Sequence, residues 1–453
     1  MTFVLTPTTT TPPAPTNLHA VPAVPRVSTS LLLALSVAAS LSPSLLPRAS
    51  LVQAVVTGLF AAAALVVSAV AHRITSRVHR TCPRPRARRV ALGLALLTVG
   101  AVGIADAQWQ NGVRESWGVP RVGPMYWIEV VCGSVSVCAL LVVIGIGSAR
   151  GAGKLGAMRL LATTAVAAVA VSVFGFDWAR ESFAQRYAQA DLVSSTVQEH
   201  AVDPVGGVSV GVQGQRFLAG GEGSTAVRTY VGLRAAPTYG ERAELAADEL
   251  ERSGGLAKAH VVIAVPTGSG WVDENAVRGF DERFGGDVAT VALQYSDQPS
   301  WATFLFAEDA AIESTRALRV AVEAKLAALD EDGRPTLHIY GQSLGSVAGS
   351  AALQPDSSAV CSTLWAGPPA NKVDTGQGVV LANTSDPVVW WSSELIFSPP
   401  DLTKARVDAP VPQWIPLVSF AQTSVDLLFA LDAPAGHGHR YGEDQGTGLL
   451  DCG

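Results

Sequence analysis

The sequence predicts an all-α transmembrane bundle followed by an α/β domain with a mostly parallel sheet and helices on both of its faces. Uncharged apolar segments, several of them long enough to cross a bilayer, are concentrated before residue 178. After that point short apolar runs alternate with helical stretches, as strands joined by crossover helices do. One of these runs ends at Gly341-Gln-Ser-Leu-Gly345, where a sharp turn before a small-residue helix is expected.

The composition agrees with this division. Of the 453 residues, 48% are hydrophobic and 15% are charged, which is too apolar for an ordinary soluble enzyme. The length allows two or more domains. The formal net charge is -6 and the second half has no basic face, so we expect no nucleic-acid partner.

The first half is predicted to lie in the lipid bilayer. Residues 1–28 are rich in threonine and proline and are expected to form a disordered tail. Residues 29–178 are expected to form about five helices, or four if the segment interrupted by Pro43 does not cross. A secretory signal is the alternative for that segment, but further apolar segments follow it at once. The five apolar segments are residues 27–47, 51–71, 90–105, 122–148 and 160–176.

Positive charges are distributed unevenly between the connections of these segments. The alternate connections hold only Arg48, Arg114 and Arg121. Because basic connections stay in the cytoplasm, everything after the fifth segment is expected on the outer face. The basic connections, after the second segment and before the fifth, hold Arg73, Arg77, Arg80, Arg84, Arg86, Arg88 and Arg89, and Arg150, Lys154 and Arg159.

The second half begins after a glycine-rich connection. Residues 179–224 start as a polar stalk and become rich in glycine, so we interpret them as a linker. The α/β domain is expected at residues 225–453. Helices are predicted at 241–252 and 311–329, and directly after Ser343. Strands are predicted at 227–233, 260–265, 288–294, 337–340, 362–365 and 379–382.

Ser343 is the candidate nucleophile. It lies between a short apolar run and a run of small residues, which is the strand, turn and helix in which Gly-x-Ser-x-Gly exposes a serine hydroxyl. Gly341 and Gly345 allow neighbouring elements to approach the strained turn. The backbone N–H of Leu344, at the start of the helix, is placed to bind an oxyanion.

A serine nucleophile requires a base and an orienting carboxylate, which follow it in chain order in this arrangement. His437 and His439 are the only histidines after Ser343. We favour His437 as the base because Gly436 and Gly438 flank it, and His439 is expected to support the loop or line the pocket. As a zinc site the pair lacks matching cysteine or carboxylate ligands.

Asp386 is the favoured carboxylate. It follows the apolar run at 379–382 and is stopped by Pro387, so it lies just past the carboxyl end of a predicted strand. The alternative is that it only opens a turn, as Asp-Pro pairs often do. The other acidic candidates after the nucleophile are Asp356, Asp374, Asp401, Asp408, Asp426, Asp432 and Glu394.

A second oxyanion donor is expected from the loop after the strand at 260–265. This loop contains Gly268, Ser269 and Gly270, whose backbone N–H groups would face a substrate. Ser269 is a rival nucleophile, but no helix is predicted after it. The loop lacks the Lys of a phosphate-binding loop. We therefore expect neither a cofactor nor a metal.

The five cysteines form no Cys-x-x-Cys pair and fit no zinc pattern. Cys361 and Cys452 fall in the second half and are able to pair if that half is in an oxidising compartment.

Six stretches of the second half carry a resemblance to a known family: 265–271, 286–296, Gly341-Gln-Ser-Leu-Gly-Ser346, Trp365-Ala-Gly-Pro-Pro369, Ser385-Asp-Pro-Val-Val-Trp-Trp391 and Gly436-His-Gly-His-Arg-Tyr441. With them the second half resembles the catalytic domain of the actinobacterial membrane-anchored α/β-hydrolase family, and the apolar first half resembles that family's multi-span amino-terminal domain. The departure is Gln342, where such families often have Glu. The resemblance implies a serine esterase or lipase-like enzyme.

These observations lead to a specific expectation. The chain is predicted to be a membrane-anchored serine hydrolase that uses Ser343, Asp386 and one of the two histidines, with an acyl-enzyme on an ester substrate of the membrane or cell envelope. Its expected partners are the lipid bilayer and a small-molecule or lipid ester. The alternatives are an acyltransferase with the same triad, a non-catalytic receptor or assembly protein on a hydrolase scaffold, and a transporter.

Overall fold

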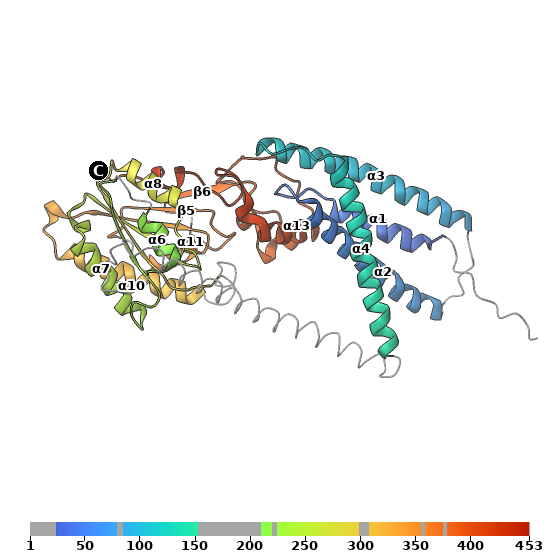
Figure 1. Ribbon diagram of the computed structural model, residues 1–453, viewed down its shortest axis with the longest axis horizontal. Helices are drawn as coiled ribbons and strands as arrows, with labels where there is room; N and C mark the ends of the chain where they lie inside the picture. Colours follow the sequence, from blue (N-terminus) through green and yellow to red (C-terminus); the bar gives the residue numbers. More distant parts are fainter. Residues whose placement is uncertain are drawn as a thin grey trace, which may run out of the picture.

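The structure, a computed structural model, describes residues 24–78, 85–152, 210–219, 224–298, 308–354, 358–374 and 378–452. It has a helical region at the amino-terminal end and an α/β region at the other, with helix α13 (Val418–Asp426) between them (Figure 1). The predicted order of a helical bundle followed by an α/β domain is confirmed.

The helical region contains α1 (Val27–Ser40), α2 (Ser50–Val78), α3 (Pro85–Ser116) and α4 (Pro124–Ala152). Among the described residues, α2, α3 and α4 are long and apolar enough to cross a membrane, whereas α1 is shorter. Four of the five expected apolar segments are therefore helices, and the fifth, 160–176, lies outside the described residues.

Small residues allow these helices to approach one another closely. A Cβ atom added at Gly58 of α2 would lie 2.7 Å from Cβ of Val137 on α4, and one added at Gly133 of α4 would lie 2.7 Å from Cβ of Ala54 on α2. Glycine at both positions lets the two backbones pack side by side, as small residues do between membrane helices.

The α/β region is built on a seven-stranded parallel sheet with the order β1-β3-β2-β4-β5-β6-β7. The six predicted strands are all present. The seventh, β7, has only two residues and no apolar run marks it in the sequence. The strands are β1 (Val227–Val231), β2 (His260–Val265), β3 (Val288–Leu293), β4 (Thr336–Gln342), β5 (Ser362–Ala366), β6 (Val379–Asn383) and β7 (Ala405–Arg406).

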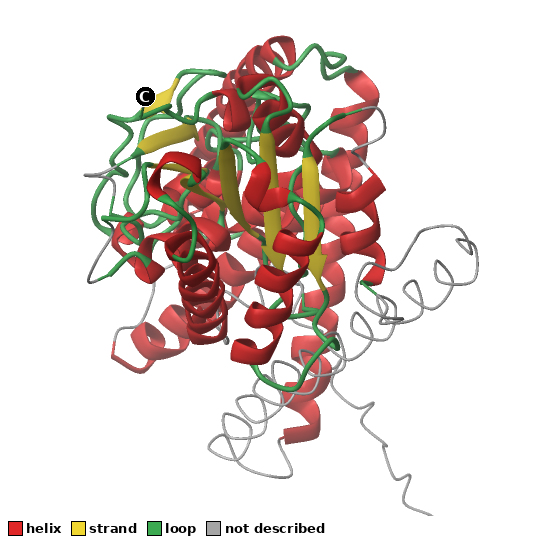
Figure 2. Cartoon of the chain, turned by 90° about the vertical axis from the view of Figure 1, so that its left-hand side faces the viewer, coloured by secondary structure: helices red, strands yellow, loops and turns green. Residues whose placement is uncertain are grey.

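Helices cover both faces of this sheet (Figure 2). One face packs against α7 (Tyr239–Arg252), α10 (Glu308–Ala327) and α11 (Leu344–Ala352). The other packs against α6 (Gly211–Ala219) and α8 (Glu274–Arg283). The remaining elements are α12 (Pro387–Trp390), α14 (Asp444–Thr447) and the 3-10 turns η1 (Gly255–Ala257), η2 (Glu331–Gly333), η3 (Ser393–Ile396) and η4 (Leu427–Asp432).

The predicted linker at 179–224 is wrong at its carboxyl end. Helix α6 lies within it, and Phe217 of this helix is buried against the sheet. A Cβ atom added at Gly214 would meet the ring of Tyr230 on β1 at 2.5 Å. Gly214, one of the glycines that suggested a flexible connection, instead allows a helix to approach the sheet. The α/β unit therefore begins before residue 225.

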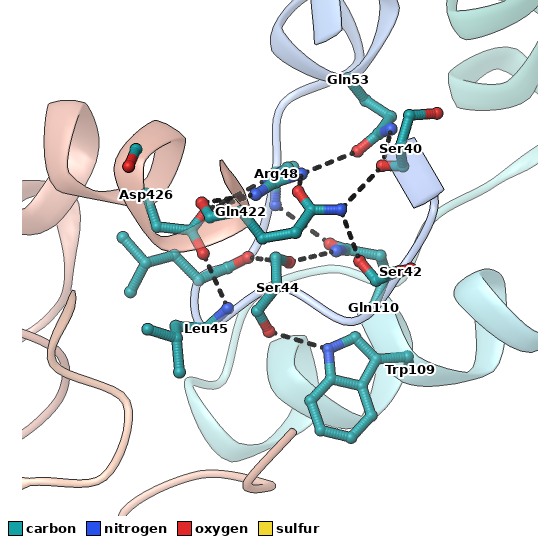
Figure 3. A network of polar contacts seen from close by, with 12 residues as sticks. Ser40, Ser42, Ser44, Leu45, Arg48, Gln53, Trp109, Gln110, Gln422 and Asp426 are labelled. Carbon is teal, nitrogen blue, oxygen red and sulfur yellow. Dashed lines mark hydrogen bonds and ion pairs between the residues drawn. The ribbon is translucent and has the colours of Figure 1, made fainter. Parts of the chain in front are cut away.

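The two regions are joined by a buried polar network (Figure 3). Arg48, in the connection between α1 and α2, forms an ion pair with Asp426 of α13 at 2.8 Å, and their side chains are 3% and 1% exposed. The Arg48 guanidinium also donates to Oε1 of Gln422 at 2.5 Å, and Nε2 of Gln422 donates to the carbonyl oxygens of Ala39, Ser40 and Ser42. Both buried charges have hydrogen-bond partners, so this network can hold the two regions together without leaving an unpaired charge.

A disulfide between Cys361 and Cys452 fixes the carboxyl end of the chain beside β5. The pairing that the sequence allowed is therefore present in the structure. It closes a sequence separation of 91 residues, and a loop of that size loses considerable conformational entropy in the unfolded chain.

Candidate active site

Ser343 lies in a strained turn between β4 and α11. Its φ angle is 53°, which is uncommon for a residue with a side chain. The sequence permits the turn because a Cβ atom at Gly341 would lie 2.3 Å from the carbonyl oxygen of Gly345, and one at Gly345 would lie 2.3 Å from that of Val265. The strand, sharp turn and helix that the sequence predicts around Ser343 are therefore present, with backbone strain at this half-buried serine.

The candidate oxyanion donors lie on two sides of this turn. Leu344 is the first residue of α11, where backbone N–H groups have no partner within the helix. On the other side, the turn after β2 is closed by hydrogen bonds from Gly270 N to Thr267 O at 2.8 Å and from Thr267 N to Trp271 O at 2.9 Å. Gly268 and Ser269 lie inside this turn, and Ser269 lines the same cavity as Ser343.

Asp386 is fully buried just past the end of β6. Its Oδ1 accepts a hydrogen bond from the backbone N–H of Val388 at 2.8 Å. Its Oδ2 accepts from Nδ1 of His439 at 2.7 Å and from the hydroxyl of Tyr441 at 2.6 Å. A carboxylate held by three donors in a dry site has one fixed orientation, so it fixes the His439 ring as well.

The preference for His437 is wrong in geometric terms: the histidine that contacts Asp386 is His439, which also lines the cavity with Ser343. Gly436 and Gly438 both have positive φ angles, and Gly436 N donates to Arg440 O at 2.7 Å. The glycines thus form a tight turn with His437 at its tip. The second glycine returns the chain toward the protein, so the residue after it points inward.

His437 has a different partner. Its Nδ1 lies 3.2 Å from Oδ2 of Asp408, and its ring lies 5.8 Å from that of Trp117, which follows α3. Asp408 also accepts from the backbone N–H of Ser385 at 2.9 Å and from its hydroxyl. The Ser385 oxygen in turn accepts from the backbone N–H of Gly438 at 2.8 Å. Asp408 therefore ties the turn that carries Asp386 to the loop that carries His439.

Two further side chains hold the histidine loop by its backbone. Nε2 of Gln342 donates to the carbonyl oxygen of His439 at 3.2 Å, and Nδ2 of Asn383 donates to that of Gly438 at 2.8 Å. The position where the sequence departs from the related pattern therefore supports the loop next to the nucleophile. Glutamine supplies an amide N–H donor there, which an ionised glutamate lacks.

Two residues of the site were not anticipated. Tyr441 lies two positions after His439, and this spacing, typical of side chains on one side of an extended segment, was the available signal. Gly367 follows β5 directly with a φ angle of 53°, and a Cβ atom there would lie 2.7 Å from His439 and 2.8 Å from Asp386. Only glycine leaves room for the histidine and carboxylate to meet.

The cavity beside Ser343 has a volume of about 900 Å³, within the usual range for small-molecule sites. One part of its lining is polar and holds Ser343, His439, Thr267 and Ser269. Among the described residues no group of three or more histidine, cysteine or acidic side chains is arranged to hold a metal. Its apolar lining comprises Trp271, Pro369, Val388, Trp391, Leu427, Leu428, Ala430 and Leu431.

Family comparisons agree with the fold. Residues 227–378 and 372–451 match the family described as Alpha/beta-hydrolase family, and residues 41–221 match the one described as Alpha/beta-hydrolase family N-terminus. The chain therefore belongs to this alpha/beta-hydrolase family. Comparisons with curated proteins and with solved structures give no match.

Proposed function

We propose that the protein is a membrane-anchored serine hydrolase that cleaves carboxylic esters through a covalent acyl-enzyme on Ser343. The observation that carries this proposal is the contact between the buried Asp386 and Nδ1 of His439, with the His439 ring lining the cavity that Ser343 also lines. A histidine held by a carboxylate beside a serine on a strained turn is the arrangement that activates a hydroxyl nucleophile.

The proposed reaction has two halves. Oγ of Ser343 forms a bond to the ester carbonyl carbon while its proton passes to Nε2 of His439, and the oxygen that becomes negative is stabilised by N–H donors at Leu344 and in the turn after β2. The protonated histidine then gives its proton to the departing alcohol. In the second half water attacks the acyl-enzyme, His439 accepts a proton from the water, and the acid leaves as Ser343 regains its hydrogen. An alcohol in place of water would give acyl transfer.

The proposed location is the cell membrane, with the α/β region on the extracytoplasmic side. Among the described residues, three helices long and apolar enough to span a bilayer precede it. With the basic connections on the cytoplasmic side, a further crossing by the apolar segment 160–176 brings the α/β region to the outer face. The disulfide between Cys361 and Cys452 supports the same assignment, because disulfides persist in oxidising compartments.

Covalent labelling and ester hydrolysis test the proposed function together. A fluorophosphonate should label the wild-type protein, and Ser343→Ala should abolish labelling and lower hydrolysis of short p-nitrophenyl esters by on the order of 10⁴-fold or more. Ser269→Ala is the matched control: it removes the rival hydroxyl, keeps the backbone N–H, and should still be labelled. Labelling that survives in Ser343→Ala, or a wild-type protein that reacts with neither reagent, would contradict the assignment.

A further inference from the structure

One wall of the cavity consists of leucine side chains that are also open to the surroundings. Leu427, Leu428 and Leu431 all belong to η4 and line the cavity. Leu428 is 78% exposed and Leu431 is 53% exposed. Since the same side chains contact the cavity and the exterior, they mark an apolar opening near the nucleophile.

This wall is fixed to one end of the helical region. Asp426, immediately before η4, forms an ion pair with Arg48, and the backbone N–H of Leu45 donates to Oδ2 of Asp426 at 2.8 Å. Trp117 follows α3 and reaches His437 at the same end of the helices. Because η4 directly follows α13, the three leucines lie close to the contact between the helical region and α13, whose polar side chains Figure 3 shows.

The α/β surface near this junction also exposes large apolar side chains. Phe397, Val407 and Leu417 are large, exposed side chains on the segment that leads into α13. A Cβ atom added at Gly112 of α3 would lie 3.7 Å from Pro410 of this segment, which places the segment against the outer end of that helix. Exposed apolar side chains beside the ends of membrane-crossing helices fit the lipid interface better than water.

We propose that the acyl chain of a bilayer lipid ester reaches Ser343 laterally, along Leu427, Leu428 and Leu431, and that these leucines select long apolar acyl groups. This inference rests on the proposed function of Ser343. The acyl chain would pass from the lipid to the leucine side chains without crossing water. The ester carbonyl would then lie at the polar part of the cavity. An ester taken from aqueous solution is the alternative source.

The test of selectivity compares two fluorophosphonates, one with a long alkyl chain and one with a short chain, on the full-length protein in phosphatidylcholine vesicles. The ratio of the long-chain to the short-chain labelling rate should fall by about tenfold in Leu428→Asn/Leu431→Asn, because each substitution replaces apolar contact with the chain. Val320→Asn is the matched control: Val320 is 54% exposed on α10, away from this cavity, and the ratio should not change. A ratio that is unchanged in the leucine variant would overturn the acyl site.

The test of the route uses the long-chain probe in two arrangements. In one it is present in the same vesicles as the protein, and in the other it is present in a separate vesicle population. Lateral access predicts much faster labelling in the first arrangement, and equal rates would overturn it in favour of uptake from water. Labelling of Ser343 by the short-chain probe reports the proposed function separately: without it, the proposed function itself fails.

Discussion

Two histidine–aspartate pairs lie side by side in the described part of the chain, with both histidines in one loop, and they differ in what surrounds them. His439 and Asp386 are 2.7 Å apart, with side chains 7% and 0% exposed. His437 and Asp408 are 3.2 Å apart, and the His437 side chain is 24% exposed. Only the first pair includes a residue that lines the cavity beside Ser343. A histidine–aspartate contact is therefore not enough to identify a catalytic base; its place relative to the nucleophile decides.

The second pair explains how the first is held in place. Asp408 contacts Ser385, the residue before Asp386, and the hydroxyl oxygen of Ser385 contacts Gly438, the residue before His439. Ser385 and Gly438, which precede Asp386 and His439, therefore belong to one hydrogen-bond network with Asp408. Such supporting contacts orient reacting groups without touching the substrate.

The largest expected effect separates the two histidines. His439→Ala should lower kcat for ester hydrolysis by on the order of 10⁴-fold, as loss of a triad base does, because no group would accept the Ser343 proton. His437→Ala is the matched control and should retain most of the rate, since Nδ1 of His437 contacts only the supporting carboxylate. Initial rates with a short p-nitrophenyl ester measure both. If His437→Ala is the inactive variant, the assigned roles are reversed.

The next effect separates the two carboxylates. Asp408→Asn should lower kcat by about 10- to 100-fold, the scale of lost supporting contacts, while KM changes little, because Asp408 does not line the cavity. Asp386→Asn should lower kcat much more, by about 10⁴-fold, because the amide no longer orients the base correctly. Comparing kcat with KM distinguishes positioning from general unfolding. Equal decreases of kcat in the two variants would contradict the different roles assigned to Asp386 and Asp408.

The contrast also shows what the sequence was able to predict. Ser343 and Asp386 lie three and four residues after the predicted strands 337–340 and 379–382, so their places at the same edge of a parallel sheet were predictable from periodicity. The two histidines are separated by one residue in a loop, where positive φ angles at Gly436 and Gly438 turn the chain sharply and decide which ring points inward. Sequence located the turn correctly but not the direction of its side chains.

The contacts between distant segments were harder to predict. Arg48 and Asp426 are 378 positions apart, and no local pattern joins a charge in a helix connection to one on α13. Asp426 was included only as one of several acidic candidates for the triad. Likewise α6 was hidden in a glycine-rich stretch, because a glycine that permits close packing and one that permits flexibility look identical in sequence.

A pair of histidines lies toward the opposite end of β4 from Ser343. Nε2 of His338 is 3.1 Å from Nδ1 of His260, and Nδ1 of His338 is 2.8 Å from the Ser362 hydroxyl oxygen. The Ser362 hydroxyl gives its hydrogen to the carbonyl oxygen of Leu450. Ser362 must therefore accept from Nδ1 of His338, which leaves Nε2 of His338 as the acceptor for His260.

This pair should make stability, rather than catalysis, depend on pH. Burial, assisted by the neighbouring His260, lowers the pKa of His338 from 6.5 to about 4, and burial also lowers the pKa of His260. Because the unfolded chain binds the proton more readily, stability should be retained above about pH 6.5 and decrease as the pH falls toward 4, by on the order of 3 kcal/mol for His338. His338→Gln keeps a hydrogen-bond donor and acceptor but does not titrate, so its unfolding temperature should decline less over this range. The check is thermal unfolding of both full-length proteins in detergent between pH 4 and 7, and parallel curves would show that His338 does not carry the dependence.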